Sequence, residues 1–288
     1  MTGRDWLEKA KKENFAIGAF NVDSLDILKG VCIAAQKQKS PIILEFSQGE
    51  VDYFGLKNVA DLVANAREEY EIPILLNLDH SKSVDNCLEA IEAGFDLIHF
   101  DGSELPIDEN KTRAAEVVRA AHEKGLLVEG EIDKVPGSSE VHKEEIDLEF
   151  LKKSYTKPEQ AKEFADAAGV DIFAAVFGNV HGTFAIEPEL DFELLKKVRE
   201  TLPDKFLSMH GGSGISAENV REGIKVGGIV KVNINTEIRQ TFIEALKEKV
   251  NEEPTQYTYY KLANDISLAV AALIEDKIDV LGSAGKVE

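Results

Sequence analysis

Pro73-Ile-Leu-Leu-Asn-Leu-Asp-His80 is a largely apolar run, with Asn77 inside it, that ends on two polar residues. A helical pattern over 83–93 follows it, and a second apolar run over 95–101 ends on Asp101. Uninterrupted apolar strands joined by helices are typical of a parallel sheet whose two faces are both covered. The unit therefore predicts two adjacent parallel strands with their polar ends at the same edge of the sheet.

The same alternation of strand and helix recurs along the chain. Further strands are predicted over 15–21, 41–47, 126–131, 170–177, 205–209 and 229–234. Eight such units with short connections predict a (β/α)8 TIM barrel, in which the sheet closes on itself. We expect one domain over 1–288, with an extra N-terminal helix and a C-terminal helical hairpin over 257–281.

Composition restricts the partners and the compartment. The chain has 288 residues and a formal net charge of −20, which disfavours nucleic acid and anionic membranes as partners. No apolar run is long enough to span a membrane. Cys32 and Cys87 fall in helical patterns, where we expect them to be half-buried and reduced, so the sequence predicts a cytoplasmic protein.

Three of the six histidines stand at predicted strand ends, at His80, His181 and His210. Strand ends converge on one face of a barrel, so these imidazoles are expected to meet. Three imidazoles with an open fourth position suit catalytic Zn²⁺. Asp101 and Glu131 are expected to supply a second or alternate metal position, or else to hydrogen-bond the histidines from behind.

Asp79 directly precedes His80 and is the predicted proton carrier beside the metal. Successive side chains of an extended strand point to opposite faces, so one of the two would be misdirected unless the strand end relaxes this constraint. Capping of the following turn is the alternative role for Asp79. His99 shares the strand parity of Asp101 and is expected to fill the barrel interior.

The stretch from His210 to Gly214 predicts a phosphate site. Closely spaced glycines let backbone N–H groups approach a phosphate, and Ser216 is placed to cap a following helix. Asn233 and Thr236 flank the same region, and the loops after strands seven and eight commonly bind phosphate in barrels.

The ordered set of motifs resembles the class II, zinc-dependent ketose-bisphosphate aldolases, the family of fructose- and tagatose-bisphosphate aldolases. The quoted matches are Ala16-Ile-Gly-Ala-Phe-Asn-Val22, Ser40-Pro-Ile-Ile-Leu44, Leu78-Asp-His80, Asp101-Gly-Ser103, Tyr155-Thr-Lys-Pro-Glu159, Gly169-Val-Asp171, His181-Gly182, His210-Gly-Gly-Ser-Gly214 and Lys231-Val-Asn-Ile-Asn-Thr236.

The resemblance implies reversible cleavage of a ketose 1,6-bisphosphate to dihydroxyacetone phosphate and glyceraldehyde 3-phosphate. It implies that His80, His181 and His210 hold zinc, that Asp101 and Glu131 match a second metal position, and that Asp79 moves the hydroxyl proton. A monovalent cation, Na⁺ or K⁺, is also implied, as is a homodimer or homotetramer in contact through the C-terminal helices. The substrate-binding positions that we expect are Asn21, Ser47, Gly182, Gly211, Gly212, Ser213, Asn233, Ile234, Asn235 and Thr236.

The loop after Glu131 departs from the family pattern. Asp133 and Pro136 stand where glycines are usual, so Glu140 is the predicted base for the carbon-bound proton, with Glu144 and Glu145 as alternatives. A lysine usual in fructose-type members is absent near Ala185, which leaves tagatose 1,6-bisphosphate, or another substrate of a dihydroxyacetone-phosphate-dependent aldolase, as an alternative.

Two rival hypotheses remain. One is a Schiff-base aldolase with Lys231 as the nucleophile. The other is a non-catalytic subunit that binds sugar phosphates on the same barrel.

Overall fold

The computed structural model describes residues 1–142 and 148–287. Eight parallel strands form a closed barrel, in the order β1-β10-β9-β7-β5-β4-β3-β2. Their bounds are β1 (Ile17–Asn21), β2 (Ile42–Ser47), β3 (Ile74–Ser81), β4 (Leu97–Asp101), β5 (Leu127–Glu131), β7 (Ile172–Ala174), β9 (Phe206–Met209) and β10 (Ile229–Ile234). The predicted TIM barrel is confirmed.

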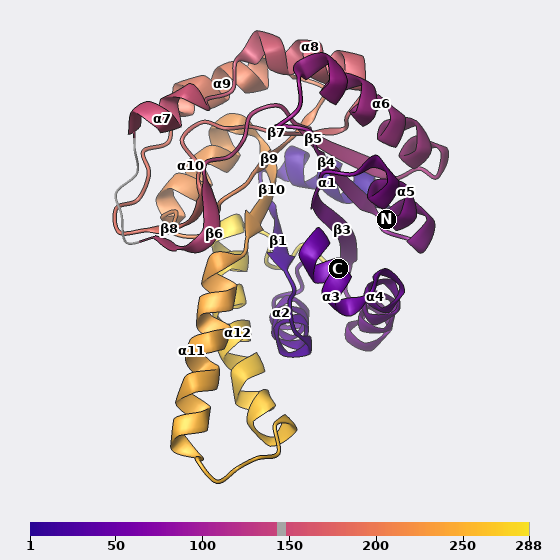
Figure 1. Ribbon diagram of the computed structural model, residues 1–288. Helices are drawn as coiled ribbons and strands as arrows, with labels where there is room; N and C mark the ends of the chain where they lie inside the picture. Colours follow the sequence, from indigo (N-terminus) through magenta and orange to yellow (C-terminus); the bar gives the residue numbers. More distant parts are fainter. Residues whose placement is uncertain (143–147, 288) are drawn as a thin grey trace.

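Helices surround the barrel as the alternation predicted (Figure 1). They are α2 (Leu25–Gln38), α4 (Leu56–Tyr70), α5 (Val84–Ala93), α6 (Ile107–Glu123), α8 (Pro158–Ala168), α9 (Phe192–Thr201), α10 (Ala217–Gly227) and α12 (Tyr260–Leu281). Their buried apolar faces and the outward faces of the strands make one continuous hydrophobic core. This core fixes the strands and therefore the directions of the side chains at their ends.

The N-terminal helix α1 (Gly3–Glu13) closes one end of the barrel. Thr2 and Asp5 form a capping box at its start, which satisfies backbone donors that the first turn leaves free. Its buried face, at Trp6, Leu7 and Ala10, packs in a cluster with apolar residues from the amino-terminal parts of the strands. The carboxyl ends of the strands therefore form the end of the barrel where a site can open.

The sixth predicted strand is shorter than the sequence indicated. Only Ile172–Ala174 pair with the neighbouring strands, although the residues over 175–180 remain buried. Gly178 has a φ of 118°, and its backbone lies so close to Glu189 that a Cβ would be 2.3 Å from that carbonyl oxygen. The left-handed turn at Gly178 takes the chain out of the barrel sheet, which an apolar run alone does not reveal.

The long polar segment after β5 contains structure that the sequence did not predict. Strand β6 (Gly137–His142) pairs in parallel with β8 (His181–Phe184). Later in the same segment, helix α7 spans Leu148–Lys153. A short additional helix, α3 (Gln48–Phe54), also precedes α4. His181 therefore lies on a small separate sheet and not on a barrel strand.

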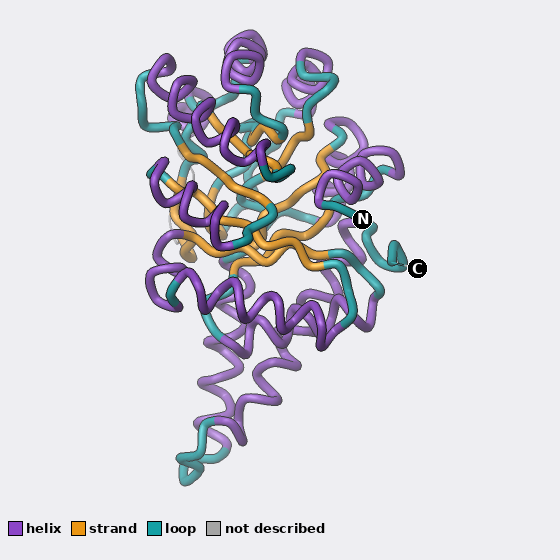
Figure 2. Tube along the Cα trace, turned by 90° about the vertical axis from the view of Figure 1, so that its right-hand side faces the viewer, coloured by secondary structure: helices purple, strands orange, loops and turns teal. Residues whose placement is uncertain are grey.

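The C-terminal helices form an arm that projects from the barrel (Figures 1 and 2). Helix α11 (Thr236–Glu252) runs outward and α12 returns to pack on α2. The predicted hairpin over 257–281 is wrong in its bounds, because 260–281 is one continuous helix whose antiparallel partner is α11. Among the described residues, no helix is both long and apolar enough to cross a membrane.

Candidate active site

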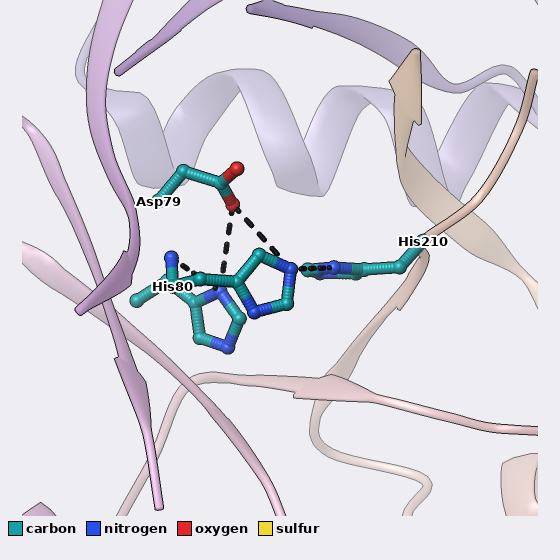
Figure 3. A group of neighbouring side chains, drawn as sticks. Asp79, His80 and His210 are labelled. Carbon is teal, nitrogen blue, oxygen red and sulfur yellow. Dashed lines mark hydrogen bonds and ion pairs between the residues drawn. The ribbon is translucent and has the colours of Figure 1, made fainter. Parts of the chain in front are cut away.

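Three imidazoles gather at the carboxyl end of the barrel. Nε2 of His80 lies 2.9 Å from Nδ1 of His210, and Figure 3 shows these two rings meeting beside Asp79. The ring centre of His181 lies 5.1 Å from that of His80 and 6.0 Å from that of His210. The structure thus brings together the three histidines that the sequence selected, with ring nitrogens of two of them facing a shared point.

A local break in β3 allows Asp79 and His80 to face the same site. His80 has a φ of 48°, in the left-handed region that non-glycine residues adopt only rarely. The pairing of β3 with β4 shifts register between Leu78 and Ser81, as at a β-bulge. The alternation of side chains along β3 is therefore broken at Asp79 and His80, so these two adjacent residues can face the same site.

Carboxylates stand behind the two facing imidazoles. Nε2 of His210 donates to Oε1 of Glu129 over 2.9 Å, while Nδ1 of His80 lies 3.1 Å from Asp101 and 3.4 Å from Glu131. The remaining ring nitrogens, Nδ1 of His210 and Nε2 of His80, are the ones directed at the shared point. A carboxylate that accepts from the outer nitrogen of a histidine fixes its tautomer and orientation toward a metal.

The donors at this point fit a divalent metal. Burial lowers the pKa of His210 to about 4 and also lowers that of His181, so both imidazoles are neutral and able to act as ligands. Burial would lower the pKa of His80 as well, but the carboxylates of Asp79, Glu131 and Asp101 outweigh it and raise that pKa, so His80 would release its proton on binding a metal. Ligand atoms of Asp79, His80, His99 and His210 all lie within 4.8 Å of one another, and those of His80, Asp101 and Glu131 form a second such group. The second group contains both carboxylates expected for a further metal position.

Asp79 is a buried and well-oriented carboxylate. Asn21 and Asn233 each donate a side-chain N–H to it over 3.3 Å, one to each oxygen. Burial opposes its ionisation, but His80, His99 and Lys231 together lower its pKa below the ordinary value. Asp79 is therefore ionised beside the imidazoles, as a proton acceptor must be.

The site opens into a cavity of about 280 Å³. Eight of the ten expected substrate-binding residues line it, namely Asn21, Ser47, Gly182, Gly211, Ser213, Asn233, Asn235 and Thr236. Gly212 and Ile234 lie outside this lining, and the N–H of Gly212 donates to the carbonyl of Asn233 over 2.9 Å. Gly211 has a φ of 67° and approaches the backbone of Val180 so closely that a Cβ would lie 1.9 Å from its oxygen.

The wall of the cavity at Ser213, Asn235 and Thr236 combines the loop after β9 with the start of α11. The hydroxyl of Ser213 accepts from the N–H groups of Asn235 and Glu237 over 3.3 Å each, which fixes the first turn. A helix start also carries the positive end of the helix dipole, so this wall suits an anion.

Comparison with known proteins agrees with this geometry. The family described as fructose-bisphosphate aldolase class-II matches residues 1–286. The chain belongs to this family. It is therefore an aldolase, an enzyme of the aldehyde-lyase class.

Relatives of this aldolase are similar over nearly their whole length. The fructose-bisphosphate aldolase of Streptococcus pneumoniae is 35% identical over 99% of both chains. The sulfofructosephosphate aldolase of Alkalicoccus urumqiensis is 33% identical over 99% of this chain and 98% of that relative. The crystal structure of the YdjI aldolase from Escherichia coli K12 has a TM-score of 0.85 and 31% identity, and covers 99% of this chain and 98% of that one.

Lys231 in this aldolase cannot serve as a Schiff-base nucleophile. It is fully buried, and its ammonium lies 2.6 Å from Glu129 and 2.7 Å from Glu45. Burial alone would lower its pKa, but the two carboxylates raise it above the ordinary lysine value. A Schiff base needs a neutral amine, so the structure contradicts the Schiff-base hypothesis.

Glu140 is not in contact with the aldolase cavity. It lies on β6 with its side chain exposed, and it is absent from the residues that line the cavity. The alternative bases Glu144 and Glu145 lie outside the described residues.

Sequence analysis assigned no role toward the three histidines to Glu129 or His99, although it correctly placed His99 in the barrel interior. Glu129 orients His210, and the ring of His99 lies 4.5 Å from that of His80 and 5.0 Å from that of His210, measured between ring centres. The sequence did offer a signal for both residues, because positions i and i+2 of a strand face the same side of the sheet. Glu129 is two residues before Glu131, and His99 is two residues before Asp101. The cavity is also lined by three basic residues that the sequence analysis did not select, namely Arg239, Lys82 and Lys134.

Proposed function

We propose that this aldolase uses Zn²⁺ to cleave fructose 1,6-bisphosphate reversibly to dihydroxyacetone phosphate and glyceraldehyde 3-phosphate. The observation that carries the proposal is the pair of ring nitrogens, Nε2 of His80 and Nδ1 of His210, 2.9 Å apart and each backed by a carboxylate. His181 would complete the ligand set. When bound, zinc would act as a Lewis acid that polarises the ketone of the three-carbon unit.

The start of α11 would hold the phosphate of dihydroxyacetone phosphate. Ser213, Asn235 and Thr236 line the cavity there, and Gly182 and Gly211 line the same cavity. Oδ1 of Asn233 and Oδ1 of Asn235 are buried without a hydrogen-bond partner in the described structure, and both can accept from a substrate hydroxyl. The wall therefore offers side-chain acceptors to the hydroxyls of the three-carbon unit next to the positive end of the α11 dipole.

Cations at the cavity support a second phosphate. Lys82 and Lys134 both pair with Glu104, at 2.8 and 2.6 Å, and all three residues line the cavity. Arg239 lines it as well and pairs with Glu50 and Asp23. A chain of net charge −20 needs such local cations to bind a dianionic substrate. A monovalent cation, Na⁺ or K⁺, near the phosphate would act in the same direction.

Asp79 would move the proton of the hydroxyl at the cleaved bond. Its ionised carboxylate accepts that proton as the carbon–carbon bond breaks, the hydroxyl becomes the aldehyde carbonyl, and the electron pair of the bond passes toward the polarised ketone. Asn21 and Asn233 hold the carboxylate in place through their two hydrogen bonds. In synthesis Asp79 returns the proton to the new hydroxyl.

Glu140 would then protonate the carbon of the three-carbon unit. Its position on β6 places it next to β8, whose first residue is His181. Because its side chain is outside the cavity lining, this role requires β6 to move toward the substrate.

The metal, the assembly and the compartment complete the proposal. Asp101 and Glu131 would hold a second divalent metal together with His80.

We infer a homodimer or homotetramer in which the arm of α11 and α12 contributes the contact, because Tyr257 and Tyr260 are 91% and 74% exposed near its tip. Light scattering of the purified chain tests the assembly. A cytoplasmic location is proposed from the two unpaired cysteines.

The test is a cleavage assay with fructose and tagatose 1,6-bisphosphates, with and without added Zn²⁺. We expect faster zinc-dependent cleavage of the fructose compound. Faster cleavage of tagatose 1,6-bisphosphate would reassign the substrate. If the metal-loaded protein bound dihydroxyacetone phosphate but never exchanged its carbon-bound proton with solvent, the non-catalytic alternative would stand instead.

A further inference from the structure

We propose that His99 is a positioning residue that holds the left-handed turn at His80, and so aims Asp79 and His80 into one site. The inference rests on the zinc site proposed above. His99 itself is fully buried and is not among the residues that line the cavity, so it is not placed to contact substrate.

The turn lies at a break in the sheet. Strand β3 pairs with β4 at Leu78↔Ile98 and resumes at Ser81↔Phe100. Two residues of β3, Asp79 and His80, therefore stand opposite the single residue His99 of β4. A bulge of this kind bends the strand and redirects side chains.

The ring of His99 satisfies the amide that the bulge leaves without a ladder partner. The backbone N–H of His80 donates to Nδ1 of His99 over 3.2 Å, in the interior where an unpaired amide is costly. With a φ of 48°, His80 adopts a backbone conformation that L-residues rarely take, so a fixed hydrogen bond at this residue selects the turn over the extended strand.

This contact also determines the role of the ring. Because the backbone amide is the donor, Nδ1 of His99 is the acceptor in this contact. Nε2 has no hydrogen-bond partner in the described structure, and the nearest carboxylate oxygen recorded, Oε1 of Glu131, is 3.9 Å away. Nδ1 also lies 3.6 Å from Oδ1 of Asp79, within ion-pair distance but beyond hydrogen-bond distance. Among the described residues, the backbone N–H of His80 is therefore the group that hydrogen-bonds His99, and Asp79 is its ion-pair neighbour.

Three substitutions of His99 test this role. His99→Leu removes the acceptor, His99→Asn keeps a side-chain oxygen near the position of Nδ1, and His99→Gln places its polar group near the position of Nε2. The primary measurement is the zinc dissociation constant of each intact protein, by competition with a chromophoric chelator. Cleavage rate and the visible spectrum of the Co²⁺-loaded protein are measured alongside.

We expect His99→Leu to weaken zinc binding by about tenfold or more, since outer partners of metal ligands have effects of this size. The cleavage rate should fall with it, and the Co²⁺ spectrum should change. His99→Asn should restore both toward the wild-type values, whereas His99→Gln should resemble His99→Leu. Thermal unfolding of the Asn and Gln variants, which differ by one methylene, shows whether folding is comparable.

Two results would overturn the inference. The first is wild-type zinc affinity in His99→Leu; if cleavage is lost at the same time, His99 acts on Asp79 directly. The second is rescue by Gln but not by Asn. These results differ from a failure of the proposed function, in which the wild-type protein itself would bind no zinc.

Discussion

The ammonium of Lys231 lies 2.6 Å from a carboxylate oxygen of Glu129, inside the barrel, where both side chains are at most 1% exposed. The other oxygen of Glu129 accepts from Nε2 of His210 over 2.9 Å. The charge of Lys231 is thus connected to a candidate zinc ligand through one carboxylate. Removing Lys231 leaves two buried carboxylates, Glu129 and Glu45, without the cation that they share.

Lys231→Met should destabilise the protein by about 3–5 kcal/mol, because Glu45 and Glu129 would lose their shared cation in the interior. Denaturant unfolding monitored by circular dichroism measures the change. The matched control is Lys225→Met, which removes an exposed pair with Glu222 and should cost about 0.5 kcal/mol or less. Equal effects of the two substitutions would contradict the structural role of the buried pair.

Asp79→Ala should abolish cleavage while zinc remains bound, because Asp79 is proposed to move a proton and not to hold the metal. Exchange of the carbon-bound proton of dihydroxyacetone phosphate should persist, since it does not involve the hydroxyl at the cleaved bond. A coupled assay measures the cleavage rate, NMR in D₂O measures the exchange of the carbon-bound proton, and elemental analysis measures the zinc content. Asp85→Ala, on the exposed start of α5, is the control. Loss of zinc from the Asp79 variant would overturn its assigned role.

Glu140→Gln should slow both cleavage and carbon-proton exchange, by about 10²-fold or more if Glu140 is the general base. Zinc content should not change, because Glu140 lies on β6 and outside the cavity lining. Comparison with Glu149→Gln, at an exposed position of α7, separates this role from a general effect of charge. Undiminished exchange in the Glu140 variant would exclude it as the base.

Removal of zinc by a chelator should lower the thermal stability as well as the activity. A metal that binds only the native state stabilises it by about 4 kcal/mol when its free concentration is a thousand times the dissociation constant. Calorimetry of the apo and reloaded protein should show a higher melting temperature with Zn²⁺ than without.

Reduction with borohydride in the presence of substrate should leave no covalent adduct on the protein, because Lys231 is buried and charged. A trapped adduct would restore the Schiff-base hypothesis.

Cys32 and Cys87 should not react with thiol reagents in the native protein. Both are fully buried, contrary to the half-burial expected from sequence, and burial raises the pKa of each thiol to about 12. A raised pKa means that the native state holds the thiol proton more tightly than the unfolded chain does. The contribution of the two protonated thiols to the free energy of unfolding therefore declines as the pH rises above about 8.5, the pKa of an unfolded cysteine. A disulfide-exchange reagent should detect no thiol up to pH 9, and two per chain in guanidinium chloride.

The repeated pattern of apolar strand and helix was sufficient to predict the barrel. Each strand is buried on both faces, so its continuous hydrophobicity can be read locally, and a closed parallel sheet is the arrangement that covers eight such strands. The pattern also places polar residues at strand ends, which is why His80, His210 and Asp79 could be selected together. His181 could be selected too, although the strand to which it was assigned ends seven residues earlier, at Ala174.

The direction of each side chain at the site was decided only by the tertiary structure. Whether Asp79 and His80 face one way depends on a left-handed backbone residue and on the register between β3 and β4, and neither is encoded in the alternation of apolar residues. The same holds for Glu129, whose burial is tolerable only because Lys231 comes from a strand a hundred residues away in sequence. Local pattern fixes which strands form, whereas register and charge pairing between distant strands fix what their ends can do.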